Sequence, residues 1–438
     1  MEVTVETTAG LERRIKVQVP AERIDSEVED RLKNLRGRAK IDGFRPGKVP
    51  LSVVRSKFGS QVRQEVLGEV LQSSFYEAVT QEKLRPVGGP RIDPQVMEPG
   101  KALEYTAEFE VYPEIEIGDI AAITIKRPQV EVGDSDIDKV IDRLRKQRIE
   151  WQPVERDAQD EDRIKLNFIG TIDGEEFAGG KGNDVPLVLG SGSFIPGFEE
   201  QLRGAGKGDQ KTIEVRFPDD YHAKDLAGKT ARFATEILEV AEPKLPELDD
   251  EFVKGFQIAD GSLESFRAEI KQNMERELAD AVKGRVKQQV MDGLLQVNPV
   301  DVPKALIEEE IDRLVKQTKE QMAMGQKQPQ DLELPRSMFE AQAIRRVTLG
   351  LLLAEIARKH ELKVDGKRVR ATIEKFAASY EKPDEVVKWY YSNQEHLSNV
   401  ESMVIEDQLV DWVLEQAKVS DEPMSFDAVM NPEAEKSQ

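Results

Sequence analysis

Four short segments in the middle of the chain decide its fold there: RIKLNFIG (163–170), VPLVLG (185–190), KTIEVRF (211–217) and ARFATEILEV (231–240). Apolar and polar residues alternate along them, and glycine-rich stretches lie between them. Alternation of this kind is typical of strands that bury one face of a sheet, and the short spacing favours antiparallel neighbours. We therefore predict a compact antiparallel β-domain over residues 151–243.

The region before this domain, residues 1–112, has the pattern of an α+β domain. VTVET (3–7) and IKVQV (15–19) alternate like paired strands, and residues 91–111 predict further strands. A helix is expected after Pro20, where Ile24, Val28 and Leu32 recur every four residues, and a second one from about 51 to 84. The octapeptide GFRPGKVP (43–50) contains two glycines and two prolines, which predicts a loop between these helices.

The remaining regions are predicted to be helical. Residues 113–150 contain a charged segment, 134–149, that suits a linker or arm helix, and residues 244–438 carry apolar residues at helical spacing. The chain from about residue 420 is polar and is predicted to be loose. The expected fold class is multidomain α+β, with an α+β N-terminal domain, an antiparallel β-domain and an all-α C-terminal domain.

Composition restricts the class of protein. The 438 residues carry a net charge of −21 and no cysteine, which excludes disulfides and thiolate metal sites. The N-terminus has charged residues where a secretory signal has its apolar segment, and no run approaches the ~18 apolar residues that span a membrane. We expect a soluble cytoplasmic protein without a membrane partner, and the acidic charge argues against DNA binding.

One region departs from this acidic character. Between residues 31 and 63 a single acid, Asp42, accompanies ten basic residues. These are Arg31, Lys33, Arg36, Arg38, Lys40, Arg45, Lys48, Arg55, Lys57 and Arg63. Such an excess is a candidate docking patch for an anionic partner, but a solvated face of two helices gives the same pattern.

The middle domain resembles the FKBP family of peptidyl-prolyl isomerases over nearly all of residues 151–243. The resemblance is carried by LNFIG (166–170), DGEEF (173–177), LVLG (187–190), FIPGFE (194–199), FPDDY (217–221) and RFATE (232–236). It implies isomerisation of X–Pro bonds without covalent chemistry or a cofactor. It also implies a proline cup lined by Phe168, Phe177, Ile195, Phe198 and Phe233, with the Tyr221 hydroxyl donating to the substrate carbonyl.

Aromatic residues suit this reaction because rotation about an X–Pro bond passes through a twisted amide, at a barrier of ~18–20 kcal/mol. A dry apolar cup favours the less polar twisted state and holds the proline ring. The alternative is that these residues form only the core of a small β-domain, although the ordered series of segments favours a pocket. Ala178 stands where FKBP enzymes usually have an acid, which argues against tight binding of FKBP-type macrocyclic inhibitors.

GFRPGKVP (43–50) resembles the ribosome-binding signature of the trigger factors, a family of ribosome-associated chaperones. LPEL (245–248), NMEREL (273–278) and DVP (301–303) resemble the C-terminal region of that family. The resemblance implies docking on the large ribosomal subunit near the exit tunnel, on protein and rRNA, through Phe44, Arg45 and Lys48 on a tip shaped by Gly43 and Gly47. It also implies ATP-independent shielding of nascent and unfolded polypeptides by the helical domain, and a weak homodimer off the ribosome.

Several alternatives stay open. The tip can be an ordinary loop whose Phe44 folds into the core. The chain can be a free cytosolic prolyl isomerase and chaperone without ribosome docking, or an assembly protein with an inactive FKBP-like module. Five methionines suit an adaptable client-binding surface and equally a bundle core: Met274, Met291, Met322, Met324 and Met338.

Other chemistries lack a complete motif. Gly228-Lys229-Thr230 ends like a P-loop, but Ala223 replaces its first glycine. The three histidines are far apart in a chain without cysteine, which disfavours a structural zinc site. We therefore expect no nucleotide, metal or organic cofactor.

Overall fold

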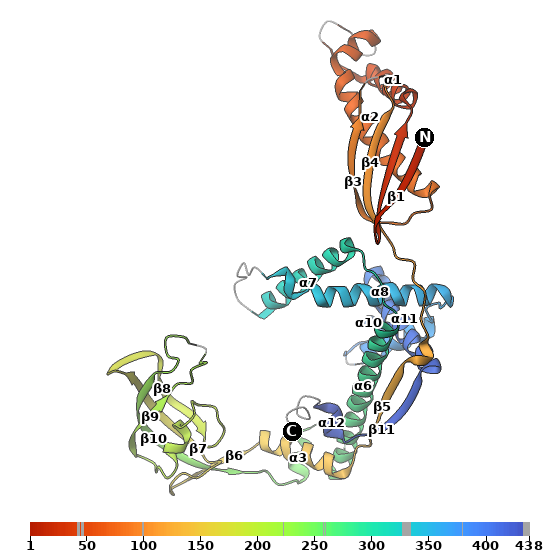
Figure 1. Cartoon of the computed structure of the whole chain (residues 1–438). Coiled ribbons are helices and arrows are strands. Elements are labelled where there is room, and N and C mark those ends of the chain that lie inside the picture. The colour runs from red at the N-terminus through yellow and green to blue at the C-terminus, as the bar shows by residue number, and fades with distance from the viewer. Residues whose placement is uncertain are drawn as a thin grey trace. The chain divides into compact units, whose positions relative to one another are not determined.

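The computed structural model of the chain (Figure 1) describes residues 1–41, 44, 48–98, 100–221, 223–256, 258, 260–325, 334–378 and 380–431, without the side chains of residues 324 and 325. The chain divides into two compact units, Met1–Arg127 with Lys283–Glu422 and Pro128–Val282 with Pro423–Gln438. None of the helices in the described ranges combines the length and the hydropathy that crossing a membrane requires.

The N-terminal region is a sheet packed against two helices, as the sequence predicts (Figure 1). Strands β1 (Glu2–Ala9), β2 (Glu12–Val19), β3 (Pro86–Val96) and β4 (Leu103–Val111) form an antiparallel sheet in the order β1-β2-β4-β3. Helices α1 (Ala21–Arg38) and α2 (Leu51–Gln81) separate β2 from β3. Because side chains alternate along β2, Ile15, Val17 and Val19 point to the same side of the sheet and are buried there. They belong to one core with residues of both helices, including Phe75 of α2.

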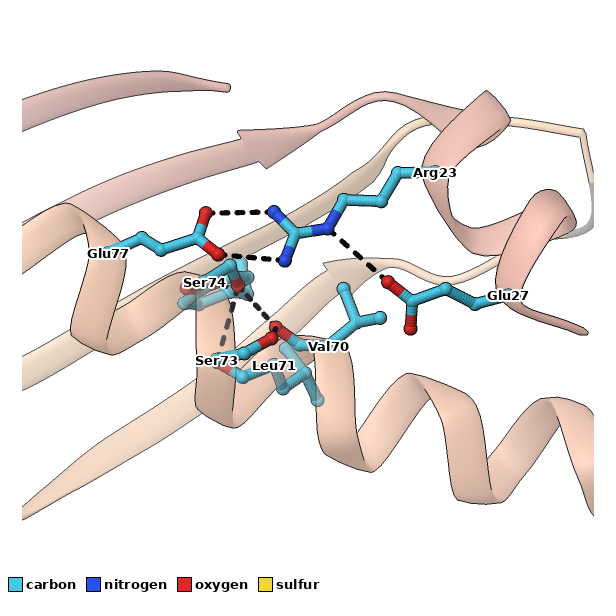
Figure 2. A network of polar contacts seen from close by, with 8 residues as sticks. Arg23, Glu27, Val70, Leu71, Ser73, Ser74 and Glu77 are labelled. Atoms are coloured by element: carbon cyan, nitrogen blue, oxygen red, sulfur yellow. Dashed lines mark hydrogen bonds and ion pairs between the residues drawn. The ribbon is translucent and has the colours of Figure 1, made fainter.

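Polar contacts fix α1 against α2 and the sheet (Figure 2). The Arg23 guanidinium of α1 donates to both carboxylate oxygens of Glu77 on α2, at 2.8 and 2.9 Å. The buried Ser74 hydroxyl donates to the Val70 carbonyl at 2.6 Å. It also pairs with the Tyr105 hydroxyl of β4 at 2.9 Å. A bidentate ion pair adds geometric specificity, so these contacts set the register of the two helices whose connecting loop forms the tip.

Residues 418–430 form regular structure, which corrects the prediction of a loose segment beginning at about residue 420. Strand β11 (Lys418–Pro423) pairs with β5 (Thr124–Gln129), and α12 (Phe426–Met430) follows it. Lys126 binds Glu422 across the pair at 3.1 Å. A polar segment can join a sheet because strands pair through their backbone N–H and C=O groups. Such pairing leaves no pattern of apolar residues in the sequence.

The β-domain lies in the second unit and is antiparallel, as predicted. Strands β6 (Glu150–Val154), β7 (Arg163–Ile172), β8 (Glu175–Val188) and β10 (Thr230–Lys244) form a sheet in the order β6-β10-β7-β8, and β9 (Gln210–Arg216) also pairs with β10. The short helix α4 (Phe198–Leu202) connects β8 to β9. The inward faces of these strands and α4 share one apolar core.

Most of the remaining chain is helical, as predicted, although strand β11 lies within the region that was expected to be all-α. The helices are α3 (Asp134–Gln147), α5 (Asp250–Lys254), α6 (Leu263–Val297), α7 (Lys304–Gly325), α8 (Glu340–Lys359), α9 (Gly366–Ala377), α10 (Pro383–Ser392) and α11 (Gln394–Gln416). Single-turn 3-10 helices lie at Ile120–Ala122 and Arg336–Met338. In the second unit α3, α5, the first part of α6 and α12 share a core, to which α12 contributes Val429.

Candidate functional site

An aromatic cluster fills one side of the β-domain core. Phe168 of β7 and Phe233 of β10 lie on the same face of adjacent strands, and their ring centroids are 5.9 Å apart. Phe198 at the start of α4 lies against both rings, with its centroid 5.2 Å from that of Phe233 and 6.1 Å from that of Phe168. Phe198 is fully buried, whereas Phe233 and Phe168 keep 5% and 9% of their surface exposed.

The rest of the predicted cup surrounds this buried floor. Phe177 of β8 meets Phe233 edge-on at 6.0 Å, and Ile195 packs against the same core from the loop before α4. Tyr221 lies against Phe217, with ring centroids 4.8 Å apart. Phe177, Ile195 and Tyr221 are only partly buried. The structure thus brings all six sequence-predicted residues into one cluster with a closed floor and a partly open rim.

Two further rings belong to the cluster and were missed from the sequence. Phe194 stacks on Phe198 at 4.8 Å with an interplanar angle of 28°. Phe217 is 3% exposed and lies between Phe177 and Tyr221. Both residues stand in the segments FIPGFE and FPDDY that carry the FKBP resemblance. The signal was present, but the sequence did not say which way either side chain turns.

Glycines leave room for the rings. A Cβ atom added at Gly170 of β7 would lie 2.5 Å from the Phe233 ring and 2.9 Å from the Phe177 ring. One added at Gly182 of β8 would lie 2.6 Å from the Phe168 ring. Carbon atoms pack at about 3.5–4.0 Å, so neither position admits a side chain while the rings stay in place.

A buried carboxylate holds the loop that joins β8 to α4. Glu199 Oε2 accepts hydrogen bonds from the backbone N–H groups of Gly190 at 2.8 Å and Gly192 at 3.1 Å. Its Oε1 accepts from the Phe194 N–H at 3.2 Å and from the Ser191 hydroxyl at 3.3 Å. Burial acts to raise the pKa of Glu199, but these backbone hydrogen bonds outweigh it and lower the pKa. The Glu199 carboxylate is therefore a charged hydrogen-bond acceptor for the residues of this loop.

The tip between α1 and α2 is only partly described. Gly43, Arg45 and Gly47 of the predicted ribosome-binding set lie outside the described residues. Phe44 is 41% exposed, which contradicts the interpretation that it folds into the core, and Lys48 is exposed.

The cations near the tip fall into two groups. Arg31 forms a bidentate pair with Glu69 at 2.8 Å, Arg63 binds Asp25 at 3.0 Å, and Lys33 binds Asp30 at 3.1 Å. The other exposed cations in the described part of the patch form no ion pair with a described carboxylate. These are Arg36, Arg38, Lys40, Lys48, Arg55 and Lys57. The unpaired cations lie at the C-terminus of α1, in the connection and at the N-terminus of α2, which surround the tip.

The structure separates core from surface in the helical region. Met274 and Met291 are 4% and 5% exposed and belong to the core, whereas Met322 and Met338 are 48% and 70% exposed. The side chain of Met324 lies outside the described residues. Exposed aromatic side chains add to the methionines, and they include Tyr380, Trp389 and Tyr391.

A hollow of about 890 Å³ lies elsewhere, on the outer face of the N-terminal sheet. Charged and polar side chains line most of it, and two of them, Arg14 and Glu108, pair with each other at 2.6 Å. The aromatic cluster has the apolar surface that binding a proline ring requires, and this hollow does not.

Three known families match separate stretches of the chain. Residues 1–144 match the family described as bacterial trigger factor protein, residues 262–415 match its C-terminus, and residues 154–240 match FKBP-type peptidyl-prolyl cis-trans isomerase. The chain is 51% identical to the trigger factor of Thioalkalivibrio sulfidiphilus (strain HL-EbGR7), covering 99% of each chain. It is 50% identical to that of Stutzerimonas stutzeri (strain A1501), covering 99% of this chain and 98% of the relative.

A solved structure described as "Promiscuous Substrate Recognition in Folding and Assembly Activities of the Trigger Factor Chaperone" aligns with a TM-score of 0.49 at 19% identity, covering 95% of this chain and 99% of that one. This likeness is too weak to add to the assignment, which rests on the full-length relatives and the three matched families. The chain belongs to the bacterial trigger factor family, chaperones with an FKBP-type peptidyl-prolyl cis-trans isomerase domain.

Proposed function

We propose that the aromatic cluster of the β-domain is the site at which this isomerase acts on X–Pro bonds. In this proposal the cup is lined by Phe168, Phe177, Ile195, Phe198 and Phe233, and the Tyr221 hydroxyl donates to a substrate carbonyl. The observation that carries the proposal is the gradient of burial, from a closed floor at Phe198 to a partly open rim at Phe177 and Ile195. A closed core has no such open side.

The cup has a limited chemical task. In the planar X–Pro amide, resonance places charge on the carbonyl oxygen, and that charge falls when the bond twists. Aromatic walls exclude water and thereby disfavour the planar amide relative to the twisted one. The Ile195 N–H has no acceptor among the described residues, so it can donate to the substrate backbone and hold it while the bond turns.

A proline-peptide isomerisation assay on the full chain tests this site. Phe198→Ala and Phe233→Ala each remove a ring from the floor and are expected to lower kcat/KM at least tenfold, about 1.4 kcal/mol of transition-state stabilisation. Ile169→Ala is the matched control, because Ile169 follows Phe168 on β7 but is exposed on the opposite face. Activity that persists in both floor variants would show that the site lies elsewhere.

We further propose that the tip docks on the large ribosomal subunit near the exit tunnel. The observation that carries this proposal is an exposed Phe44 in a connection flanked by exposed cations that form no ion pair with a described carboxylate. Such cations can pair with RNA phosphates, and an exposed aromatic ring supplies apolar area for a protein surface. Arg45 and Lys48 are the proposed contact cations.

Co-sedimentation with ribosomes at low and moderate salt tests the docking. The parent chain is expected to pellet with ribosomes, less at higher salt, and a Phe44→Ala, Arg45→Ala, Lys48→Ala variant is expected to stay in the supernatant. If both chains pellet equally, the tip is not the anchor. If neither pellets, the alternative of a free isomerase and chaperone without ribosome docking is favoured.

The helical region is proposed to shield nascent and unfolded polypeptides without ATP, in the cytosol where ribosomes translate. Exposed Met322, Met338, Trp389 and Tyr391 support this proposal, because scattered apolar surface binds many sequences weakly. The same surface supports a weak homodimer off the ribosome. A variant that lacks residues 151–243 is expected still to suppress the aggregation of unfolded proteins. If this variant does not suppress aggregation, the isomerase domain is the part that binds clients.

A further inference from the structure

The loop of residues 190–197 carries part of the cup, but its first four residues have no apolar side chain to anchor them. Phe194 and Ile195 pack against the domain core, whereas residues 190–193 are exposed. Gly190, Gly192 and Gly197 have φ values of 87°, 68° and 88°, a left-handed conformation that glycine adopts without strain. A glycine-rich loop loses much conformational entropy when it is ordered, so some other contact must hold it.

Two polar residues of α4 supply these contacts. At the far end, the Gln201 side chain donates to the carbonyl groups of Gly197 and of Glu214 on β9, both at 2.9 Å. At the near end, the Glu199 carboxylate accepts the four hydrogen bonds described above, from residues 190, 191, 192 and 194. Glu199 is 8% exposed and follows the fully buried Phe198, so its own position is fixed by the core.

We propose that Glu199 is a positioning residue for prolyl isomerisation, holding the 190–195 loop so that Phe194 and Ile195 complete the cup. A carboxylate suits this role because both of its oxygens accept, and hydrogen bonds to a charged acceptor are roughly twice as strong as neutral ones. The Phe194 N–H is one of its donors, and the Phe194 ring stacks on Phe198 at 4.8 Å. The carboxylate therefore acts on the cup through the backbone and does not touch the substrate.

The variant Glu199→Gln keeps the size of the side chain and removes one of its two accepting ends. The amide NH₂ group then faces backbone N–H donors on one side, so at least one donor loses its acceptor. A loop that is ordered only part of the time reduces apparent substrate affinity by the ordered fraction, while the complex, once formed, turns over normally. Loss of folded protein has the opposite signature, a lower apparent kcat at unchanged KM.

The experiment compares Glu199→Gln with Glu200→Gln, the exposed neighbour on the same helix, in the full chain. For Glu199→Gln we expect KM for an X–Pro peptide to rise about tenfold with kcat unchanged, and amide hydrogen exchange in residues 190–195 to accelerate. Glu200→Gln is expected to leave both measurements at parent values. Faster exchange with unchanged KM, a fall confined to kcat, or unchanged exchange would each overturn the inference.

If Glu199→Gln does not fold, Ser191→Ala carries the test, because it removes one donor from the exposed part of the loop. A two- to threefold rise in KM is then expected, and an unchanged KM overturns the inference. The inference rests on the proposed cup, so Phe233→Ala is measured alongside. If Phe233→Ala is fully active, the cup itself is misplaced; if Phe233→Ala is inactive and Glu199→Gln is normal, only the positioning role fails.

Discussion

A single methyl group added beneath the aromatic cluster tests whether its rings must lie where the structure places them. Gly170 of β7 faces the core, and its Cβ position lies 2.5 Å from Phe233 and 2.9 Å from Phe177. The variant Gly170→Ala removes no ring and changes no charge. Because carbon atoms pack at about 3.5–4.0 Å, both rings have to retreat by about 1 Å.

The magnitude follows from the contacts that these rings make. Phe233 meets Phe168, Phe177 and Phe198 edge-on, and overpacking a core by one carbon atom costs about 1–3 kcal/mol. If the transition state for isomerisation loses the same amount, kcat/KM falls about 5- to 150-fold. The assay is isomerisation of a short X–Pro peptide by the full chain, together with thermal unfolding of the isomerase domain.

Ile169→Ala again serves as the matched control, because the preceding residue on β7 faces outward. It is expected to retain parent activity. Parent-like kcat/KM in Gly170→Ala, with the domain folded, would refute the reasoning, since it would mean that the rings tolerate displacement or take no part in catalysis.

Three further predictions concern separate parts of the chain. In α6, an alanine Cβ at Gly284 meets open space, so Gly284→Ala should raise the free energy of unfolding by about 0.5–1 kcal/mol. At Gly293 the added Cβ would lie 2.4 Å from Ile123, so Gly293→Ala should lower the free energy of unfolding. Chemical denaturation measures both changes. Because the pKa of Glu199 is lowered in the folded chain, its stabilisation is present above the ordinary glutamate pKa of 4.5 and is lost as the pH falls through the lowered value. The protection of the amides of residues 190–195, measured relative to their intrinsic exchange rate at each pH, should therefore fall in acid in the parent and show no such fall in Glu199→Gln. Arg36→Gln, which removes an unpaired cation, should reduce the salt slope of ribosome binding by about 1, and Arg31→Gln, which removes a cation already paired with Glu69, should reduce it less.

The sequence predicts the fold of the β-domain well because its signal is local. Alternation along β7, β9 and β10 is visible in each segment alone, and antiparallel neighbours need only short connections. The same holds for the N-terminal sheet and its two helices. The pairing of β5 with β11 was missed because both strands are short and polar and lie almost 300 residues apart, so nothing in either segment points to the other.

The candidate site was predictable by residue type but not by geometry. The six residues of the proposed cup come from the FKBP resemblance, and the structure brings them into one cluster. The contribution of Glu199 depends on backbone N–H groups, which carry no side-chain signature, although Gly190 and Gly192 mark the turn that presents them. In the helical region, buried Met274 and exposed Met338 look alike in the sequence because long helices with apolar residues on several sides do not reveal which side is covered.

The pairing of β5 with β11 also means that these two partner strands are synthesised at different times. Lys126 and its partner Glu422 are 296 residues apart. At about 5–20 residues per second, translation supplies the second strand about 15–60 s after the first. Throughout that interval β5 has an open edge, the kind of surface that recruits strands from other chains. Strand β5 of this trigger factor family member therefore has no strand partner until β11 has been translated.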